Sequence, residues 1–246
     1  MKTALRELSA PHRTERGDTR LGAALAFVAG AVNAGGFLAV GAYTSHMSGM
    51  VSSIADFIVT HQWQTALLAF FHICAFFVGS VLSSLLINWA RLKQLSGEFA
   101  LSLMLEASLL ILFGVLAASG LGNDLTGLNV LISLLCLIMG LQNGLITKIS
   151  HSDIRTTHMT GVITDLGIET GRFLFGKAVH ADARFNPAKT RRLALLLTGF
   201  LVGGLLGAAL FRLAGYVMVV PLAIILIILA IVPVAEDLAR LFASRR

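Results

Sequence analysis

Long uninterrupted apolar blocks constrain this chain more than any other feature of its sequence. Each is close to the roughly 20 residues that an α-helix needs to cross a bilayer, or longer. The blocks lie at about Leu21–Gly41, Thr65–Ala90, Phe99–Ala118, Leu125–Thr147, Leu193–Leu213 and Tyr216–Val234. Their apolar residues are continuous rather than alternating, which predicts helices and not β-strands. We therefore expect an all-α integral membrane protein with six transmembrane helices.

The composition agrees with this class. Hydrophobic residues make up 56% of the 246 residues and charged residues 13%, with a mean hydropathy of +0.83. A soluble domain carries about 25% charged residues. The net charge of +6 is better explained by basic residues that flank membrane spans than by nucleic-acid binding. We expect the lipid bilayer as a partner, no nucleic acid, no metal and no cofactor, with Cys74 and Cys136 as buried thiols inside spans.

The positions of Lys and Arg predict the orientation. With six spans and a cytoplasmic N-terminus, every one of the 19 basic residues except Arg212 falls on the cytoplasmic side. Both termini are then cytoplasmic. A rival arrangement with eight spans would place five basic residues outside: Arg91, Lys93, Lys148, Arg155 and Arg212. Six spans are therefore favoured over eight.

An ordered set of motifs occurs twice. TSHMSG at residues 44–49 is repeated as TTHMTG at residues 156–161. Each copy follows a G-x-x-N motif and precedes an F-x-V-G motif: Gly30 to Asn33, Gly140 to Asn143, Phe76 to Gly79, and Phe200 to Gly203. We predict a cytoplasmic tail over 1–20, a three-helix repeat over 21–120, a second over 121–236, and a cytoplasmic tail over 237–246. Because three is odd, the second repeat must be inverted relative to the first, as in many transporters.

A short broken or re-entrant helix is expected after each HM(S/T)G motif. Thr44 or Ser45, and Thr156 or Thr157, are N-cap candidates for these helices. Gly49 and Gly161 would let another backbone approach closely. A half-helix N-terminus also suits an anionic group.

Two roles are open for the motif histidines. His46 and His158 could line one central pathway and change protonation near neutral pH. They could equally cap or cross-link their own hairpins by hydrogen bonds. A metal site is disfavoured, because two distant histidines supply too few ligands.

Acidic residues mark the second short segment. His158, Asp165, Glu169 and Arg172 fall on one helical stripe, and pairs within it are predicted. The stripe is either a solvated face, or Asp165 or Glu169 couples protons or cations to transport. Asp56 is the only acid in the first short segment, and His72 is a lone polar residue in the second span.

Small residues form ridges along several spans. One contains Gly22, Ala26, Gly30 and Ala34, another Gly199, Gly203 and Gly207, and a third Gly140 and Gly144. Such ridges allow close helix packing, either within one chain or in a homo-oligomer.

The combination of G-x-x-N, TSHMSG, a Gly-rich span and GLQNGLITK followed by TTHMTG resembles the YoaK family of bacterial membrane proteins. The resemblance runs from about Gly22 to Val234. It implies a multi-pass protein of the bacterial cytoplasmic (inner) membrane. It carries over no substrate and no catalytic residue, because the family's function is not defined.

These observations lead to a functional hypothesis: a transporter or channel for an unknown small solute, with its pathway between inverted repeats. The candidate pathway residues are Asn33, His46, Ser48, Asp56, Asn143, His158, Thr160, Asp165 and Glu169. The alternatives are a non-catalytic assembly or sensor subunit and a membrane-embedded enzyme that acts on lipid. Motifs of the types HExxH, GxSxG, CxxC and a Gly-rich phosphate loop do not occur, so we expect no enzyme.

Overall fold

The computed structural model describes residues 15–95, 97–149, 157–179 and 185–243. Helices make up these residues and no strand occurs among them, which confirms the all-α expectation. The α-helices are α2 (Glu15–Val40), α3 (Met47–Val59), α4 (Trp63–Leu92), α5 (Ala100–Ala118), α6 (Leu125–Ile149), α7 (Met159–Val179), α8 (Pro187–Ala214) and α9 (Val219–Ala243). Two short 3₁₀ turns, η1 (Leu121–Asn123) and η2 (Gly215–Met218), connect α5 to α6 and α8 to α9.

Among the described residues, five stretches of helix are long and apolar enough to cross a membrane. The fifth, Pro187–Asp237, contains both α8 and most of α9, joined through η2. Each apolar block of the sequence therefore corresponds to one helix. This build is consistent with a multi-pass membrane protein.

The long helices exchange partners between the two halves of the chain. In the first half, α2 carries the G-x-x-N motif, and it packs along α8, which carries the F-x-V-G motif of the second half. A Cβ added at Gly30 would collide with the carbonyl oxygen of Phe200, and one at Gly203 with that of Phe27. Glycine is needed at both positions because the two backbones touch.

The same arrangement holds between α4 and α6. A Cβ at Gly140 would collide with the carbonyl oxygen of Phe76, and one at Gly79 with that of Leu137. The Ser80 hydroxyl also donates to the Gly140 carbonyl oxygen at 2.9 Å. Each G-x-x-N helix thus packs on the F-x-V-G helix of the other half, so these small-residue ridges serve contacts within the chain.

Close contacts also give the relative directions of the helices. Successive residues of α2 meet successive residues of α8, so the two helices are parallel: Ala23 lies at Gly199, Phe27 at Gly203 and Ala31 at Gly207. The pair α4 and α6 is also parallel, with Phe76 at Gly140 and Ser80 at Gly144. The pair α5 and α9 is antiparallel, with Gly97 at Pro233 and Gly114 at Val219. The pair α2 and α6 is antiparallel too, with Leu25 at Gln142 and Gly36 at Leu135.

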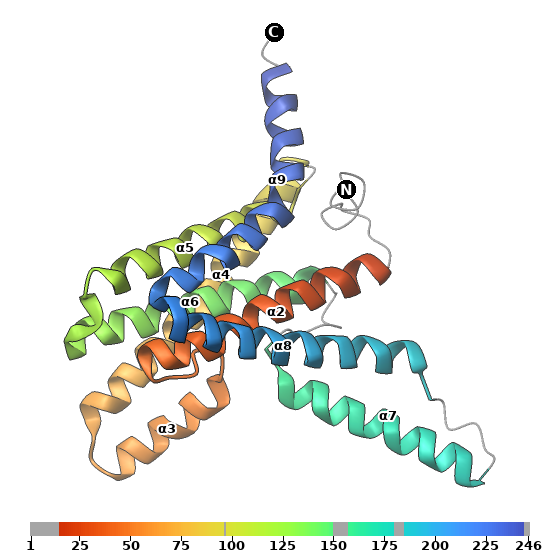
Figure 1. Ribbon diagram of the computed structural model, residues 1–246, viewed down its shortest axis with the longest axis horizontal. Helices are drawn as coiled ribbons and strands as arrows, with labels where there is room; N and C mark the ends of the chain where they lie inside the picture. Colours follow the sequence, from red (N-terminus) through yellow and green to blue (C-terminus); the bar gives the residue numbers. More distant parts are fainter. Residues whose placement is uncertain (1–14, 96, 150–156, 180–184, 244–246) are drawn as a thin grey trace.

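The two remaining helices, α3 and α7, lie to one side of this bundle. Figure 1 shows both beginning below the middle of the molecule and running toward opposite ends of its long axis. The first packs on α4 and the second on α8. The 13 residues of α3 span about 20 Å at 1.5 Å per residue, short of the roughly 30 Å hydrocarbon core. A short helix was expected after each motif: α3 confirms this for the first motif, whereas the expectation is wrong for the second, because α7 has 21 residues and is long enough to match the hydrocarbon core.

Candidate functional site

The first HM(S/T)G motif is tied back to the middle of α2. The Ser45 hydroxyl donates to Oδ1 of Asn33 at 2.8 Å. Asn33 lies about two turns before the end of α2 at Val40, and Gly41 turns the chain with a φ of 73° that favours glycine. The start of α3 is therefore held about 10 Å back along α2 from that helix's end.

The second motif makes the same contact in the other half. The Thr157 hydroxyl donates to Oδ1 of Asn143 on α6 at 2.7 Å. The Asn143 amide nitrogen donates to the carbonyl oxygen of Met139 at 2.8 Å, which fixes the orientation of the amide. Ser45 and Thr157 occupy the same motif position, as do Asn33 and Asn143. The same hydrogen bond therefore ties each motif to an asparagine. We call these two contacts the asparagine anchors.

The expected N-caps are wrong for α3. Its N-cap residue is His46, which makes no side-chain capping hydrogen bond. Ser45 is engaged with Asn33 instead, and the buried Thr44 hydroxyl has no hydrogen-bond partner among the described residues. In the second half Thr157 is likewise used for the anchor, and Thr156 lies outside the described residues.

The motif glycines also differ from expectation. A Cβ at Gly49 would lie 2.6 Å from Nδ1 of His46, so this glycine makes room for the histidine ring and not for another backbone. Around Gly161 nothing lies within 4 Å of the added Cβ. The exposed rings of His46 and His158 occupy equivalent positions at the starts of α3 and α7. That both histidines line one pathway stays a prediction.

Other motif and short-helix candidates lie on exposed surface. Ser48 and Thr160 occupy the first turns of α3 and α7, and Asp56 lies in the last turn of α3. All three side chains are exposed. By contrast, His72 is buried in α4, and its Nε2 has no hydrogen-bond partner among the described residues.

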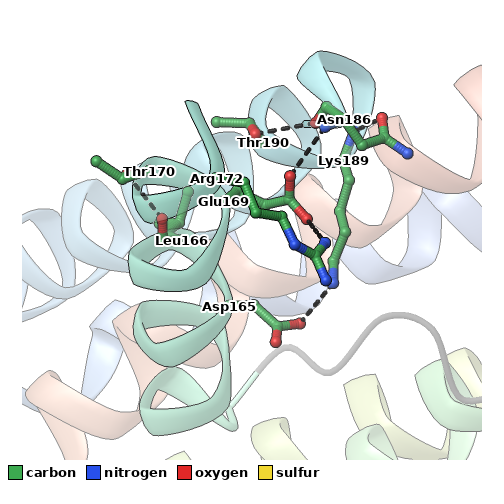
Figure 2. Close-up of polar contacts among 8 residues, drawn as sticks. All are labelled: Asp165, Leu166, Glu169, Thr170, Arg172, Asn186, Lys189 and Thr190. Carbon is green, nitrogen blue, oxygen red and sulfur yellow. Dashed lines mark hydrogen bonds and ion pairs between the residues drawn. The ribbon is translucent and has the colours of Figure 1, made fainter. Parts of the chain in front are cut away.

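The acids of α7 bind to basic or backbone groups. Glu169 is fully buried, and its Oε1 accepts from Nη1 of Arg172 at 2.7 Å. Its Oε2 accepts from the backbone N–H of Asn186, just before α8, at 2.9 Å. Figure 2 shows this contact joining α7 to the start of α8. The predicted Glu169–Arg172 pair is confirmed, whereas a solvated face is the wrong description of Glu169.

Asp165 has a different partner. Its Oδ2 lies 3.2 Å from Nζ of Lys189 on α8 (Figure 2), so it is paired across helices and not within its stripe. Lys189 also donates its backbone N–H to the Asn186 side chain, which caps α8. Together the two acids hold α7 onto α8.

One acid of the spans was missed by the sequence reasoning. Glu106 is fully buried in α5, and neither carboxyl oxygen has a hydrogen-bond partner among the described residues. Ser102, one turn earlier, and Ser83 on α4 are buried with unpartnered hydroxyls as well. The signal was available, because Glu106 is the only charged residue within the block Phe99–Ala118. In the described part of the chain no cluster of three or more His, Cys, Asp or Glu could hold a metal ion.

Comparison with known proteins gives a family and no activity. A family model described as "Protein of unknown function (DUF1275)" matches residues 21–232. No curated protein and no solved structure matches the chain. The matched segment contains both motifs, both asparagine anchors and Glu106.

Proposed function

The chain belongs to the DUF1275 family of proteins of unknown function, and we propose that it is a transporter or channel for a small solute. Its pathway lies between two inverted halves of three spans each. The protein resides in the bacterial cytoplasmic membrane with both termini inside, and it catalyses no reaction. The observation that carries the proposal is the pair of asparagine anchors, Asn33 with Ser45 and Asn143 with Thr157.

The anchors support half-helices that begin within the membrane. Along the antiparallel pair of α2 and α6, Asn33 and Asn143 lie at levels about seven residues apart. At the helical rise per residue this is roughly 10 Å along the helix axes. Both motifs are therefore held near the level at which α2 and α6 cross. Broken helices that start near the bilayer midplane, at the interface of two repeats, are where secondary transporters bind their substrates. Such backbone is tolerated at this depth when protein or a water-filled cavity covers it.

The helix directions support six spans with α3 and α7 re-entrant. In that arrangement α5 and α9 run in opposite directions, and so do α2 and α6. An eight-span arrangement would make each of these pairs parallel. The contacts of Gly114 with Val219, and of Leu25 with Gln142, belong to antiparallel pairs.

The start of α3 offers groups that could hold a solute. The uncapped N-terminus of a helix presents backbone N–H groups and the positive end of its dipole. His46 stands at this end without a capping bond, and its exposed ring can donate or accept a hydrogen bond. His158 occupies the equivalent position at the start of α7 in the second half. A polar or anionic solute fits this chemistry best.

A flux experiment tests the proposal. Purified protein is reconstituted into liposomes, and uptake is screened against panels of small carboxylates, amino acids, sugars and inorganic ions. We expect flux for at least one class above that of empty liposomes, and a marked loss in the double variants His46→Ala/His158→Ala and Asn33→Leu/Asn143→Leu. As a control, Gly171→Ala changes an exposed position of α7 with nothing near the added Cβ, and it should keep the flux. Wild-type protein that moves none of the solutes would overturn the proposal.

A further inference from the structure

We propose that Glu106 is a proton-binding site inside the membrane that couples proton movement to solute movement. The inference rests on the proposed transport function for its physiological meaning. The site itself rests on independent observations, because Glu106 lies on α5, outside both motifs and outside the helices α3 and α7 that follow them.

The surroundings of the carboxyl group determine its protonation state. Glu106 is 0% exposed, and neither Oε1 nor Oε2 has a hydrogen-bond partner among the described residues. A carboxylate that is removed from water without donors or a countercharge is strongly disfavoured, whereas the neutral acid is tolerated. In this conformation the side chain therefore carries its proton.

No basic group with a described side chain neutralises Glu106. The elements packed against α5 are α4, α6, α9, η1 and η2. Their titratable groups with described side chains are His72, Cys74, Arg91, Cys136, Lys148, Tyr216, Glu236 and Asp237. Within the described chain none of them forms a hydrogen bond or ion pair with Glu106. Arg91, the nearest in sequence, is held by Glu98 just before α5.

The polar groups around this region are hydroxyls. Ser102 lies one turn before Glu106 on the same face of α5, and Ser83 lies on α4, which packs against α5. Both hydroxyls are fully buried and unpartnered. Neutral hydroxyls can donate to a carboxylate or accept from a carboxylic acid, and Ser102, on the same face of α5 as Glu106, is therefore compatible with both states of the acid. They supply no positive charge that would hold the group permanently ionised.

Along its apolar part, α9 provides no second acid that could pair with Glu106. α9 packs antiparallel on α5 and has no charged residue between Val219 and Ala235. A conformational change that separated α5 from α9 or α6 would bring water to Glu106. The O–H bond would then break, with the proton passing to water and the electron pair staying on the carboxylate. Reprotonation from the opposite side of the membrane would complete the cycle.

Carbodiimide labelling tests the site without a known solute. Dicyclohexylcarbodiimide enters apolar regions and reacts with a protonated carboxyl group: the acid O–H adds across a C=N bond, and the adduct rearranges to a stable N-acylurea. Purified full-length protein is labelled across a pH series, and the modified peptide is located by mass spectrometry. We expect one dominant adduct on Glu106 whose yield falls as pH rises. Glu106→Gln should lose this adduct, and Asp56→Asn, at an exposed acid of α3, should keep it.

Several outcomes would overturn the inference. Absence of the adduct on Glu106 would do so, as would a yield that does not change with pH. Protection by sodium ions at constant pH would also overturn it, by assigning the carboxyl group to a metal cation. Because the adduct is located in the wild-type protein, the test does not depend on whether Glu106→Gln folds. Glu106→Asp, which keeps a carboxyl group, provides a second variant that should still label.

The liposome experiment separates this inference from the proposed function. A pH-sensitive dye trapped in the liposomes reports proton entry during solute uptake. We expect proton entry that depends on the solute in the wild type and none in Glu106→Gln. Solute flux without proton entry would overturn the role of Glu106 and leave transport standing. Absence of any solute flux would overturn the transport proposal, while the labelling result would still report on the proton site.

Discussion

The asparagine anchors show what single residues contribute to this fold. The sequence indicated that Asn33 and Asn143 belong with the two motifs, but it suggested capping as the role of the neighbouring hydroxyls. Asn143 is buried and Asn33 is half-buried, and an amide oxygen that is withdrawn from water needs a hydrogen-bond donor. Ser45 and Thr157 therefore bind the asparagines, and the helix that follows the first motif begins without a side-chain cap.

A double-mutant cycle tests the first anchor. The variants Asn33→Ala, Ser45→Ala and the double variant are compared by unfolding in mixed detergent micelles. We expect a coupling energy of about 0.5–1.5 kcal/mol, the range of hydrogen bonds between membrane helices. The second anchor, Asn143 with Thr157, provides the matched repeat of the experiment. Additive effects of the two single changes would contradict the anchor.

Glu169 is the residue whose loss should most affect α7. Glu169→Ala removes acceptors from Arg172 and from the Asn186 backbone, and hydrogen bonds to charged groups contribute about 1.5–3 kcal/mol each. Because Arg172 is 46% exposed in its side chain, we expect a smaller total loss of about 1–2 kcal/mol. Hydrogen–deuterium exchange should show faster exchange in α7.

The control for this prediction is Asp165→Asn on the same helix. Its pair with Lys189 is more open, with side chains 43% and 33% exposed. Exposed pairs are worth roughly 0–1 kcal/mol, so exchange in α7 should change little. Equal effects of the two substitutions would show that the burial of Glu169 does not matter.

At the scale of helices, hydropathy predicted where the long helices lie in the sequence. It did not predict which helices pack on each other. The fourth block, Leu125–Thr147, differs from α6 by only two residues at its end. The sixth block ends at Val234, whereas α9 includes Pro233 and continues to Ala243. A helix does not have to end where its apolar composition ends. Which helix packs on which depends on tertiary contacts. The ridges of Gly30 and Gly203 suggested close packing but could not say with what.

Glycine substitutions test the exchanged packing. Gly203→Ala places a methyl group against the carbonyl oxygen of Phe27, and overpacking of this kind costs about 1–3 kcal/mol. Gly167→Ala, in a helix with nothing near the added Cβ, should be neutral or stabilise by up to about 1 kcal/mol. Thermal unfolding in detergent should therefore show a lower melting temperature for the first variant only. Indistinguishable melting curves would contradict the contact between α2 and α8.

At the scale of the whole molecule, the repeated motifs predicted two related halves but not their exchange of helices. Both halves use the same sequence signals at the same places. However, a motif read along one chain does not reveal that its partner lies in the other half. The sequence shows that Glu106 lies in an apolar block, but it does not show that the carboxyl group lacks partners, since that depends on every helix around α5.

Membrane topology provides the prediction for the whole chain. In a variant with Cys74 and Cys136 replaced by Ser, single cysteines are placed at Gln62, between α3 and α4, and at Ala178, at the end of α7. An impermeant maleimide should label Gln62→Cys in intact cells and Ala178→Cys only after lysis. That pattern belongs to six spans with two re-entrant helices. If neither labels before lysis while an external control does, eight spans are favoured and the inverted repeat is withdrawn.

The exchange of helices between the halves has a consequence for how the protein is made. α2 is synthesised first, but α8, which covers its glycine face, comes only after α3 to α7. Until then the backbone around Gly30 has only lipid, or a membrane insertase, against it. Translation that stalls before Pro187 would leave this face uncovered, and such fragments should be recognised and degraded by membrane proteases. Synthesis of α8 is thus the event that covers the glycine face of the first helix.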